Sequence, residues 1–299
     1  MVPVTGRTSV IAIFGPTASG KTGVAEALAD RVDGELISAD AMQIYRGLPI
    51  LTNQPTRPTR LVGIWRLDHE ASVGEYQCLA HEAVDETIAS GRTAIVVGGT
   101  GLYLRAALAD IAFPPPPDPG AREHFERLYD RLGPEGSYKL LTERDPAAAA
   151  RVHANDRRRV VRALELREAG ESLAPGRDHL WDDEMRHPTV VFGLQVPRDV
   201  LAARVAERTR AMLEQGAEDE AHCALGGPIS ATARHIMGLR EIHGLPREEA
   251  IAALEQRTRR YAAYQRKWMR RIPGLVPLDG TRAPEESADE ITTIVGAPA

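Results

Sequence analysis

The sequence predicts an α/β protein whose parallel-sheet core is interrupted by a helical insertion domain. Short apolar runs alternate with helical patterns over residues 1–112, as in a parallel sheet with crossover helices. A proline-rich segment at 113–120 then stops this alternation, because proline can continue neither a helix nor a central strand. An apolar strand returns at 189–196. We therefore expect a core formed by residues 1–112 and 189–299, with residues 113–188 as the insertion.

The predicted core begins with a strand over 9–14, a glycine-rich loop and a helix over 21–31. A second strand over 35–38 ends beside Asp40. In open parallel sheets, ligands bind outside the carboxyl ends of the strands. Asp40 and the glycine-rich loop are therefore expected at the same binding edge.

Two further core elements follow from the same signals. Ser72 is the predicted cap of a helix that reaches Ser90, and Glu75 completes a capping box. A third strand over 93–97 turns through Gly98-Gly99-Thr100-Gly101 into another helix.

Helical patterns dominate the rest of the chain. They run from the proline-rich segment to about Gly170, through the predicted insertion. After the strand at 189–196, the chain is predicted to be helical from Pro197 almost to Ile272, with a break near Gly226-Gly227-Pro228.

Net charge and its distribution favour different partners. A net charge of −5 disfavours a nucleic-acid binder, because phosphate backbones are held mainly by excess Lys and Arg. All but three of the 37 Lys and Arg residues are arginines, however, and these cluster at 151–167 and 257–271. Guanidinium groups bind phosphate with paired hydrogen bonds and stack on bases. A GC-rich genome would account for the excess of arginine but not for its clustering.

Cysteine content and hydropathy predict a cytoplasmic protein. Cys78 and Cys223 are far apart and fit neither a disulfide framework nor a zinc site, so we expect buried or half-buried thiols. The apolar run at 9–14 is too short for a signal peptide, and no uncharged stretch approaches membrane-spanning length. We expect a monomer that does not bind membranes.

One motif indicates phosphate binding. It has the pattern G-x-x-x-x-G-K-[ST] and consists of Gly15, Pro16, Thr17, Ala18, Ser19, Gly20, Lys21 and Thr22. Its backbone amides and the following helix N-terminus cradle anionic oxygens, while Lys21 adds a charge and Thr22 a Mg²⁺ ligand. The motif predicts a P-loop NTPase-like core. The alternative is a glycine turn that binds nothing, which the flanking strand and helix disfavour.

The acid that usually accompanies such a loop is missing. Most P-loop ATPases and GTPases have an apolar strand that ends in a metal-binding Asp. Here the strand at 94–97 ends in Gly98-Gly99-Thr100. Asp40 is the remaining acid at this edge, which favours proton abstraction from a substrate over nucleotide hydrolysis. The alternative is that Asp40 only caps a helix.

Taken in order along the chain, these motifs resemble bacterial tRNA dimethylallyltransferases, also called tRNA isopentenyltransferases or IPP transferases. The matching stretches cover most of the sequence and are specific in combination. They are Gly15 to Thr22, Ile37 to Gly47, Val96 to Tyr103, Asp145 to Glu165 and Thr258 to Trp268.

The resemblance implies transfer of a dimethylallyl group from its diphosphate to N6 of adenosine 37 in tRNAs that read codons starting with U. An allylic diphosphate can ionise, so the enzyme has to stabilise the leaving diphosphate rather than supply a nucleophile. By resemblance Asp40 is the base, Thr100 its hydrogen-bonding partner near the amine, and Arg208 a diphosphate ligand. Mg²⁺ on Thr22 is the implied cofactor. The alternative for Arg208 is an exposed helix arginine paired with a surface acid.

The implied partners are dimethylallyl diphosphate and the anticodon stem-loop of tRNA. The residues expected to bind tRNA come from both predicted domains. They are Asp40, Ala41, Met42, Gln43, Thr100, Arg122, Arg158, Arg159, Val160, Val161, Arg162, His235, Ile236, Met237, Gly238, Leu239 and Arg240. The basic helix at 257–271, with its aromatic residues, suits a phosphate track, or else packs its aromatics into the core.

The sequence departs from the family pattern at several places. Pro49 to Pro55 replaces the usual Asp-Ile-Gly-Thr-Ala-Lys-Pro, the usual His-His-Leu is absent from 60–68, and Ala263-Tyr264 replaces a basic pair. Ala41 stands for the common Ser, and His235 for Gln or Arg. Three other functions stay open: a small-molecule or nucleotide kinase, a prenyltransferase acting on free AMP or ATP, and a non-enzymatic RNA-binding module.

Overall fold

The computed structural model describes residues 8–114, 120–173 and 184–296. The chain divides into two compact units, residues 1–111 with 181–299 and residues 112–180. Most of the proline-rich segment and much of the predicted loose stretch before Pro188 lie outside the described residues. Across the described ranges, no helix is both long and apolar enough to span a bilayer.

The first unit is built on a five-stranded parallel sheet with the order β2-β3-β1-β4-β5. The strands are β1 (Val10–Phe14), β2 (Gly34–Ser38), β3 (Thr93–Gly98), β4 (Thr189–Gln195) and β5 (Val276–Asp279). Ile13 of β1 lies opposite Val97 on one side and Phe192 on the other, in parallel register. The predicted α/β fold with a parallel core is confirmed. Parallel pairing brings every strand's carboxyl end to one edge of the sheet.

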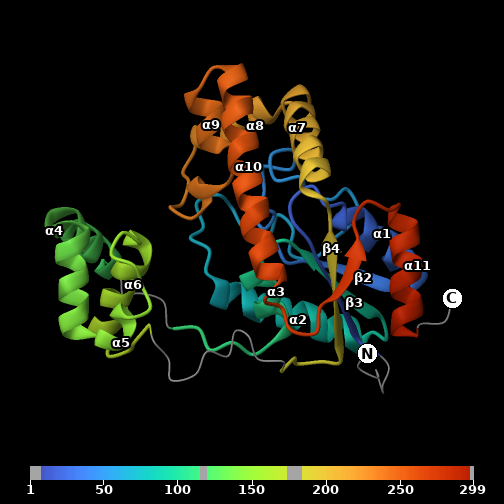
Figure 1. Ribbon diagram of the computed structural model, residues 1–299, viewed down its shortest axis with the longest axis horizontal. Coiled ribbons are helices and arrows are strands. Elements are labelled where there is room, and N and C mark those ends of the chain that lie inside the picture. The colour runs from blue at the N-terminus through green and yellow to red at the C-terminus, as the bar shows by residue number, and fades with distance from the viewer. Residues whose placement is uncertain (1–7, 115–119, 174–183, 297–299) are drawn as a thin grey trace. The chain divides into compact units, whose positions relative to one another are not determined.

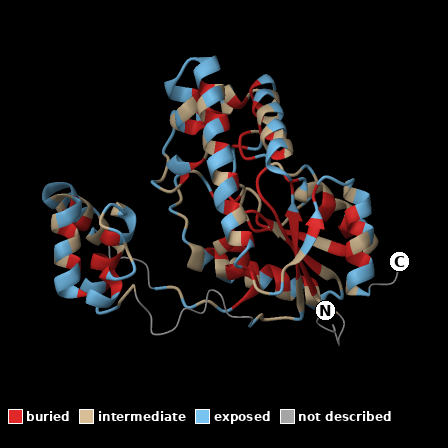
Figure 2. Ribbon diagram, viewed as in Figure 1, coloured by how far each residue is buried: buried red, intermediate tan, exposed pale blue. Residues whose placement is uncertain are grey.

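Helices cover both faces of this sheet (Figure 1). On one face, α1 (Lys21–Arg31) packs against α11 (Pro284–Val295), and on the other α2 (Val73–Ala89) packs against α3 (Gly101–Leu108). Burying both faces explains why β1 is apolar throughout rather than alternating. Figure 2 shows the sheet as the main buried region of this unit.

The remaining helices of the first unit lie beyond the carboxyl edge of the sheet (Figure 1). They are α7 (Arg198–Glu214), α8 (Ala217–Leu225), α9 (Leu239–Gly244) and α10 (Arg247–Met269). α10 packs along α7, and α9 packs against both α8 and α10. The predicted helical region is thus interrupted more widely than expected, because residues 226–238 hold only the short 3-10 helix at Ala233–His235.

Three local predictions differ from the structure. Ser72 caps α2 by accepting from Glu75 N at 3.1 Å, but the Glu75 carboxylate contacts His69 instead of completing a capping box. β5 and α11 were not predicted; β5 has only four residues and contains Pro277, which an edge strand tolerates. Both cysteines are exposed rather than buried, in keeping with their places on the outer sides of α2 and α8.

The second unit is helical. It consists of α4 (Ala121–Arg144), α5 (Pro146–Ala149) and α6 (Arg157–Glu168). α4 kinks at Gly133, where φ is +71° and Pro134 follows. Phe125 and Leu141 of α4 pack with Leu164 of α6 in the unit's own core.

A buried carboxylate joins two arginines in this unit. The Glu165 side chain is 1% exposed and accepts from Arg122 Nε at 3.2 Å and from Arg162 Nη1 at 3.1 Å. Each Glu165 oxygen therefore has its own guanidinium donor, and α6 is tied to the start of α4. Arg122 and Arg162 thus already have a role inside the fold.

We expect Glu165→Ala to destabilise the full-length protein by about 3 kcal/mol, because it removes a buried acid that pairs with two guanidinium groups. Arg159→Ala is the matched control, since it removes only an exposed 4.0 Å pair with Asp156 and should cost less than about 1 kcal/mol. Urea unfolding, combined with hydrogen exchange of residues 121–168, measures both. Equal effects of the two changes would contradict the structural role of Glu165.

Candidate active site

The phosphate loop joins β1 to α1 at the carboxyl edge of the sheet. Gly20 has φ of +89°, a conformation that favours glycine, and no atom lies within 4 Å of the position that a Cβ would take. No side chain caps α1, and no acid stands in its first turn. The amide groups at the start of α1 are therefore left for an anion from outside the chain.

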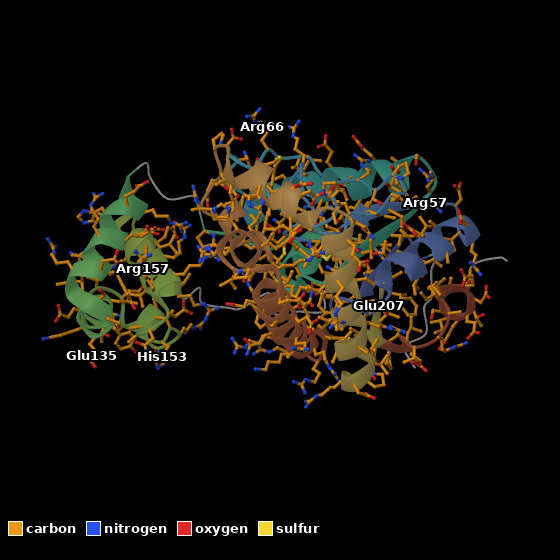
Figure 3. All side chains as sticks on the ribbon, turned by 90° about the horizontal axis from the view of Figure 1, so that it is seen from above. Arg57, Arg66, Glu135, His153, Arg157 and Glu207 are labelled. Carbon is orange, nitrogen blue, oxygen red and sulfur yellow. The ribbon has the colours of Figure 1, made fainter. Side chains whose placement is uncertain are left out.

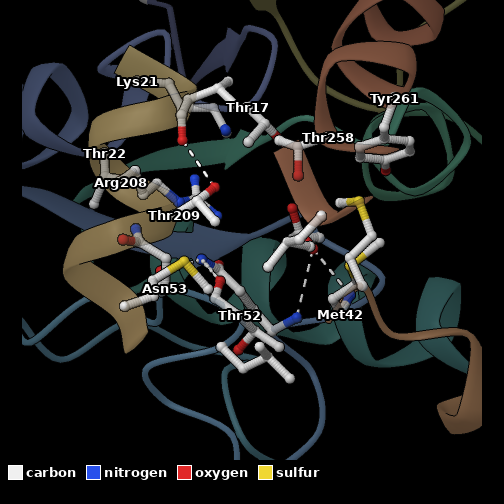
Figure 4. A pocket seen from close by; sticks show the side chains of 17 residues that line it. Thr17, Lys21, Thr22, Met42, Thr52, Asn53, Arg208, Thr209, Thr258 and Tyr261 are labelled. Carbon is white, nitrogen blue, oxygen red and sulfur yellow. Dashed lines mark hydrogen bonds between the residues drawn. The ribbon is translucent and has the colours of Figure 1, made fainter. Parts of the chain in front are cut away.

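Two cations adjoin this loop without a counter-ion in contact. Within the described residues, neither Lys21 nor Arg208 forms a hydrogen bond or an ion pair, although both line one pocket with Thr17 and Thr22 (Figure 4). The pKa of Lys21 is lowered to about 8, mainly by burial; the charge of Asp40 opposes this shift and that of Arg208 adds to it. Burial also lowers the pKa of Arg208. Two desolvated cations of this kind favour a bound polyanion.

The position of Arg208 excludes the surface-arginine alternative. The neighbouring Glu207 is exposed on α7 (Figure 3), whereas Arg208 is half-buried and turns into the pocket. The sequence placed Arg208 near the diphosphate only by resemblance. In the structure it lies close enough to Asp40 and Lys21 for their charges to affect one another.

Asp40 follows β2 and lines the same pocket. Its Oδ1 accepts from Met42 N at 2.9 Å and from Gln43 N at 3.4 Å, so this oxygen caps a turn. Asp40 therefore has a structural role as the cap of this turn, in line with the capping alternative. No hydrogen bond engages the other carboxylate oxygen within the described residues, which leaves it for a substrate.

Thr100 lies behind the pocket rather than in its wall. Its Oγ1 accepts from Ala41 N at 3.3 Å and lies 3.2 Å from the Tyr261 hydroxyl. Tyr261 does line the pocket, and burial raises the pKa of its hydroxyl further above the usual range, so this group stays protonated. Thr100 thus links the Asp40 turn to α10 through Tyr261.

Two helices form the far wall of the pocket. Their lining residues are spaced at helical intervals, so each helix presents one stripe. The stripes are Val205, Arg208, Thr209 and Met212 on α7, and Leu254, Thr258 and Tyr261 on α10. Met42, Leu51 and Met237 add apolar surface opposite them. The pocket combines polar groups at the phosphate loop with apolar side chains that lie among threonines and amides on its other walls, which suits an anion joined to a short hydrocarbon.

One buried amide fixes α10 against the two glycine loops. Gln265 is 1% exposed; its Oε1 accepts from Thr17 N at 2.8 Å and its Nε2 donates to Gly99 O at 2.9 Å. Three residues on, the Trp268 ring packs on Gly101 so closely that a Cβ there would collide with it. Glycine at 101 is needed for this contact.

Another wall of the pocket comes from the segment Pro49 to Pro55, where the sequence departs from the family pattern. Glu220 of α8 accepts from Ile50 N and Leu51 N, both at 2.8 Å, and so holds the turn at 48–54. Gln43 Nε2 donates to Asn53 O at 2.7 Å from the pocket side. Leu51, Thr52 and Asn53 therefore face the pocket in a fixed arrangement.

The other expected tRNA residues differ in their exposure. Val160, Val161, Ile236 and Leu239 have buried side chains, which leaves only their backbone for contacts. Met237 lines the pocket, and Gly238 has φ of +97°. The exposed members are Arg158 and Arg159 in the second unit and His235 and Arg240 in the first.

Sequence reasoning missed several residues that build this site. Gln265, Thr258, Met212 and the Glu220 clamp were given no role, and for Tyr261 both a phosphate track and packing into the core were left open. The helical spacing of Leu254, Thr258, Tyr261 and Gln265 was the available signal, because a polar Gln or Thr on an otherwise buried stripe needs an internal partner.

Few groups here could hold a metal ion. The described residues contain no cluster of three or more His, Cys, Asp or Glu side chains suited to a metal. Thr22 and Asp40 line both this pocket and a smaller neighbouring one, and each offers a side-chain oxygen next to the phosphate loop. One hydroxyl and one carboxylate fit a cation that takes its other ligands from substrate phosphates and water, as Mg²⁺ usually does.

Comparisons with known proteins agree with this geometry. A family model described as IPP transferase matches residues 43–272. The tRNA dimethylallyltransferase of Streptomyces coelicolor is 38% identical over 288 residues, which cover 91% of this chain and 90% of that protein.

Solved structures give the same result. The full-length tRNA isopentenylpyrophosphate transferase of Bacillus halodurans matches with a TM-score of 0.70 and 32% identity, over 97% of this chain and 96% of that one. A eukaryotic dimethylallyltransferase acting on tRNA shares the fold, with a TM-score of 0.76 at 24% identity over 97% of this chain and 80% of that one. The resemblance read from the motifs is confirmed, and the chain belongs to the IPP transferase family.

Proposed function

We propose that this protein transfers a dimethylallyl group from dimethylallyl diphosphate to N6 of adenosine 37 in tRNAs that read codons starting with U. The observation that carries the proposal is the pair of cations, Lys21 and Arg208, beside an uncapped helix N-terminus; among the residues that the structure describes, no acid contacts either of them. An apolar wall adjoins them, as a prenyl chain requires. The names of the relatives support the same substrates.

The chemistry follows from where charge changes. The bond between C1 of the prenyl group and the diphosphate oxygen breaks, and its electron pair stays with the diphosphate. The amides of the phosphate loop, Lys21 and Arg208 stabilise this growing charge. The N6–C1 bond forms, and the N6 proton passes to the free carboxylate oxygen of Asp40, because the amine becomes acidic as it is alkylated. Thr100 positions the site by holding Tyr261 and Ala41.

Mg²⁺ is the proposed cofactor, with Thr22 as its ligand and Asp40 nearby. When bound, it would neutralise part of the charge on the diphosphate. Arg158, Arg159, His235 and Arg240 are exposed and form the proposed side-chain contacts to tRNA, whereas Arg122 and Arg162 stabilise the insertion unit around Glu165. We propose the cytoplasm as its location and a monomer as its working state.

The alternatives explain less. A kinase needs a metal-binding acid at the end of the strand beside β1, where β3 ends in Gly98, and it has no need of an apolar wall. Transfer to free AMP would leave the arginine-rich insertion without a purpose. The deciding assay supplies radiolabelled dimethylallyl diphosphate with either tRNA or AMP. Label should pass to tRNA; label on AMP alone would refute the proposed acceptor.

Donor binding should weaken as pH rises above 8. Lys21 has a lowered pKa of about 8, so it loses its charge above that pH, while the donor diphosphate keeps its own. The dissociation constant for dimethylallyl diphosphate should then rise about tenfold per pH unit between pH 8 and 10. Calorimetry without tRNA, at fixed Mg²⁺, measures this. In Lys21→Met, binding should be weaker and flat over the same range; a flat wild-type profile would contradict the prediction.

Asp40→Asn should separate the role of Asp40 as a proton acceptor from its role as the cap of the turn. The Asn oxygen can still accept from Met42 N, so the turn is kept while basicity is lost. The single-turnover rate should fall by about 100-fold to 10,000-fold, with melting temperature and tRNA affinity little changed. Asp40→Ala is the matched control, because it removes both roles and should lower the melting temperature as well. A fully active Asp40→Asn protein would mean that another group accepts the proton.

A further inference from the structure

An aromatic row runs from the pocket wall to the surface along α10. Tyr261 lines the pocket; its ring stacks on Tyr264, with centroids 6.4 Å apart and planes at 27°. The Trp268 ring meets Tyr264 edge-on, also at 6.4 Å. Tyr264 is 53% exposed, the most exposed large apolar side chain in the described part of the chain. Contacts with Tyr261 and Trp268 therefore fix the Tyr264 ring, while part of the ring stays exposed to solvent.

Free cations flank this ring. Arg260 and Lys267 stand four residues before and three residues after Tyr264, which places them on the same side of α10. Both are exposed, and neither forms a hydrogen bond or an ion pair with another described residue. In contrast, Arg257 and Arg259 on the same helix bind Glu241 and Glu255. An aromatic face between two unpaired cations fits a nucleobase together with its phosphates.

We propose that Tyr264 is a stacking platform for a nucleobase next to the target adenosine, with Arg260 and Lys267 on the adjoining phosphates. This inference rests on the proposed function. Once the adenosine enters the pocket, the neighbouring base loses a stacking partner. Tyr264 lies one ring away from the pocket wall and replaces that partner.

A tyrosine at this position gives the contact a distinct physical character. A lysine or arginine would bind phosphate and make affinity depend on salt, whereas a tyrosine ring binds a base face with little dependence on salt. Tyr264 therefore offers a stacking contact between two positively charged side chains.

The test uses an anticodon stem-loop RNA with 2-aminopurine on either side of the target adenosine. Fluorescence should be quenched on binding at one of the two positions, and Tyr264→Ala should abolish that quenching. The KM for RNA should rise about 10-fold in Tyr264→Ala, with the donor dissociation constant and the rate at saturating RNA unchanged. Tyr264→Phe should keep both the quenching and the KM, because it keeps the ring.

Two control variants separate stacking from charge. Lys267→Met should keep the quenching but reduce the log-log salt slope of RNA binding by about 0.7. Tyr264→Lys should steepen that slope without restoring the quenching. The inference is overturned if wild type shows no position-specific quenching, or if Tyr264→Ala binds RNA as wild type does. Absence of prenyl transfer by wild type to any RNA would instead overturn the proposed function.

Discussion

The buried side-chain amide of Gln265 is the contact on which the site depends. It joins the phosphate loop at Thr17 to the loop after β3 at Gly99, and it does so from α10. Since both partners are backbone groups in glycine-rich loops, the amide sets how far apart these loops lie. It also fixes the rotation of α10, and with it the positions of Thr258 and Tyr261 in the pocket wall. A binding site made from three distant parts of the chain thereby acts as one rigid object.

The distribution of charge explains how an acidic chain can hold a site for anions. Many arginines outside the pocket pair with acids, such as Arg31 with Asp289 and Arg60 with Glu86. In each of these pairs the positive charge of the arginine is balanced locally by a carboxylate. The charge of Asp40 acts on both Lys21 and Arg208. Their pKa values are nevertheless lowered by burial, which shows that holding the two positive charges in the pocket costs free energy. Because the fold already holds these charges in place, an anion bound beside them gains the full benefit of their charge, which supports the proposed diphosphate site.

The sequence predicted those parts of the site that lie in local patterns. The phosphate loop was found because its spacing identifies it, and Asp40 because it follows a predicted strand at the edge where ligands bind. The walls from α7 and α10 were not, since which helix stripe faces the pocket depends on packing between distant segments. Arg122 and Arg162 show a structural role that the sequence did not indicate. Because Arg122 lies 43 residues before Glu165, only the fold reveals that this carboxylate pairs with both arginines.

The C-terminal helix α11 has a bearing on how this protein can be engineered. Pro284, its first residue, lies against Gly23 in the first turn of α1, the turn that carries Lys21 and Thr22. Arg31 at the other end of α1 is tied to Asp289. Shortening the chain before residue 284 would release the helix that presents the phosphate-binding amides. A purification tag or fusion partner therefore belongs after residue 296, because α11 packs against α1 and stabilises the helix that begins at the candidate active site.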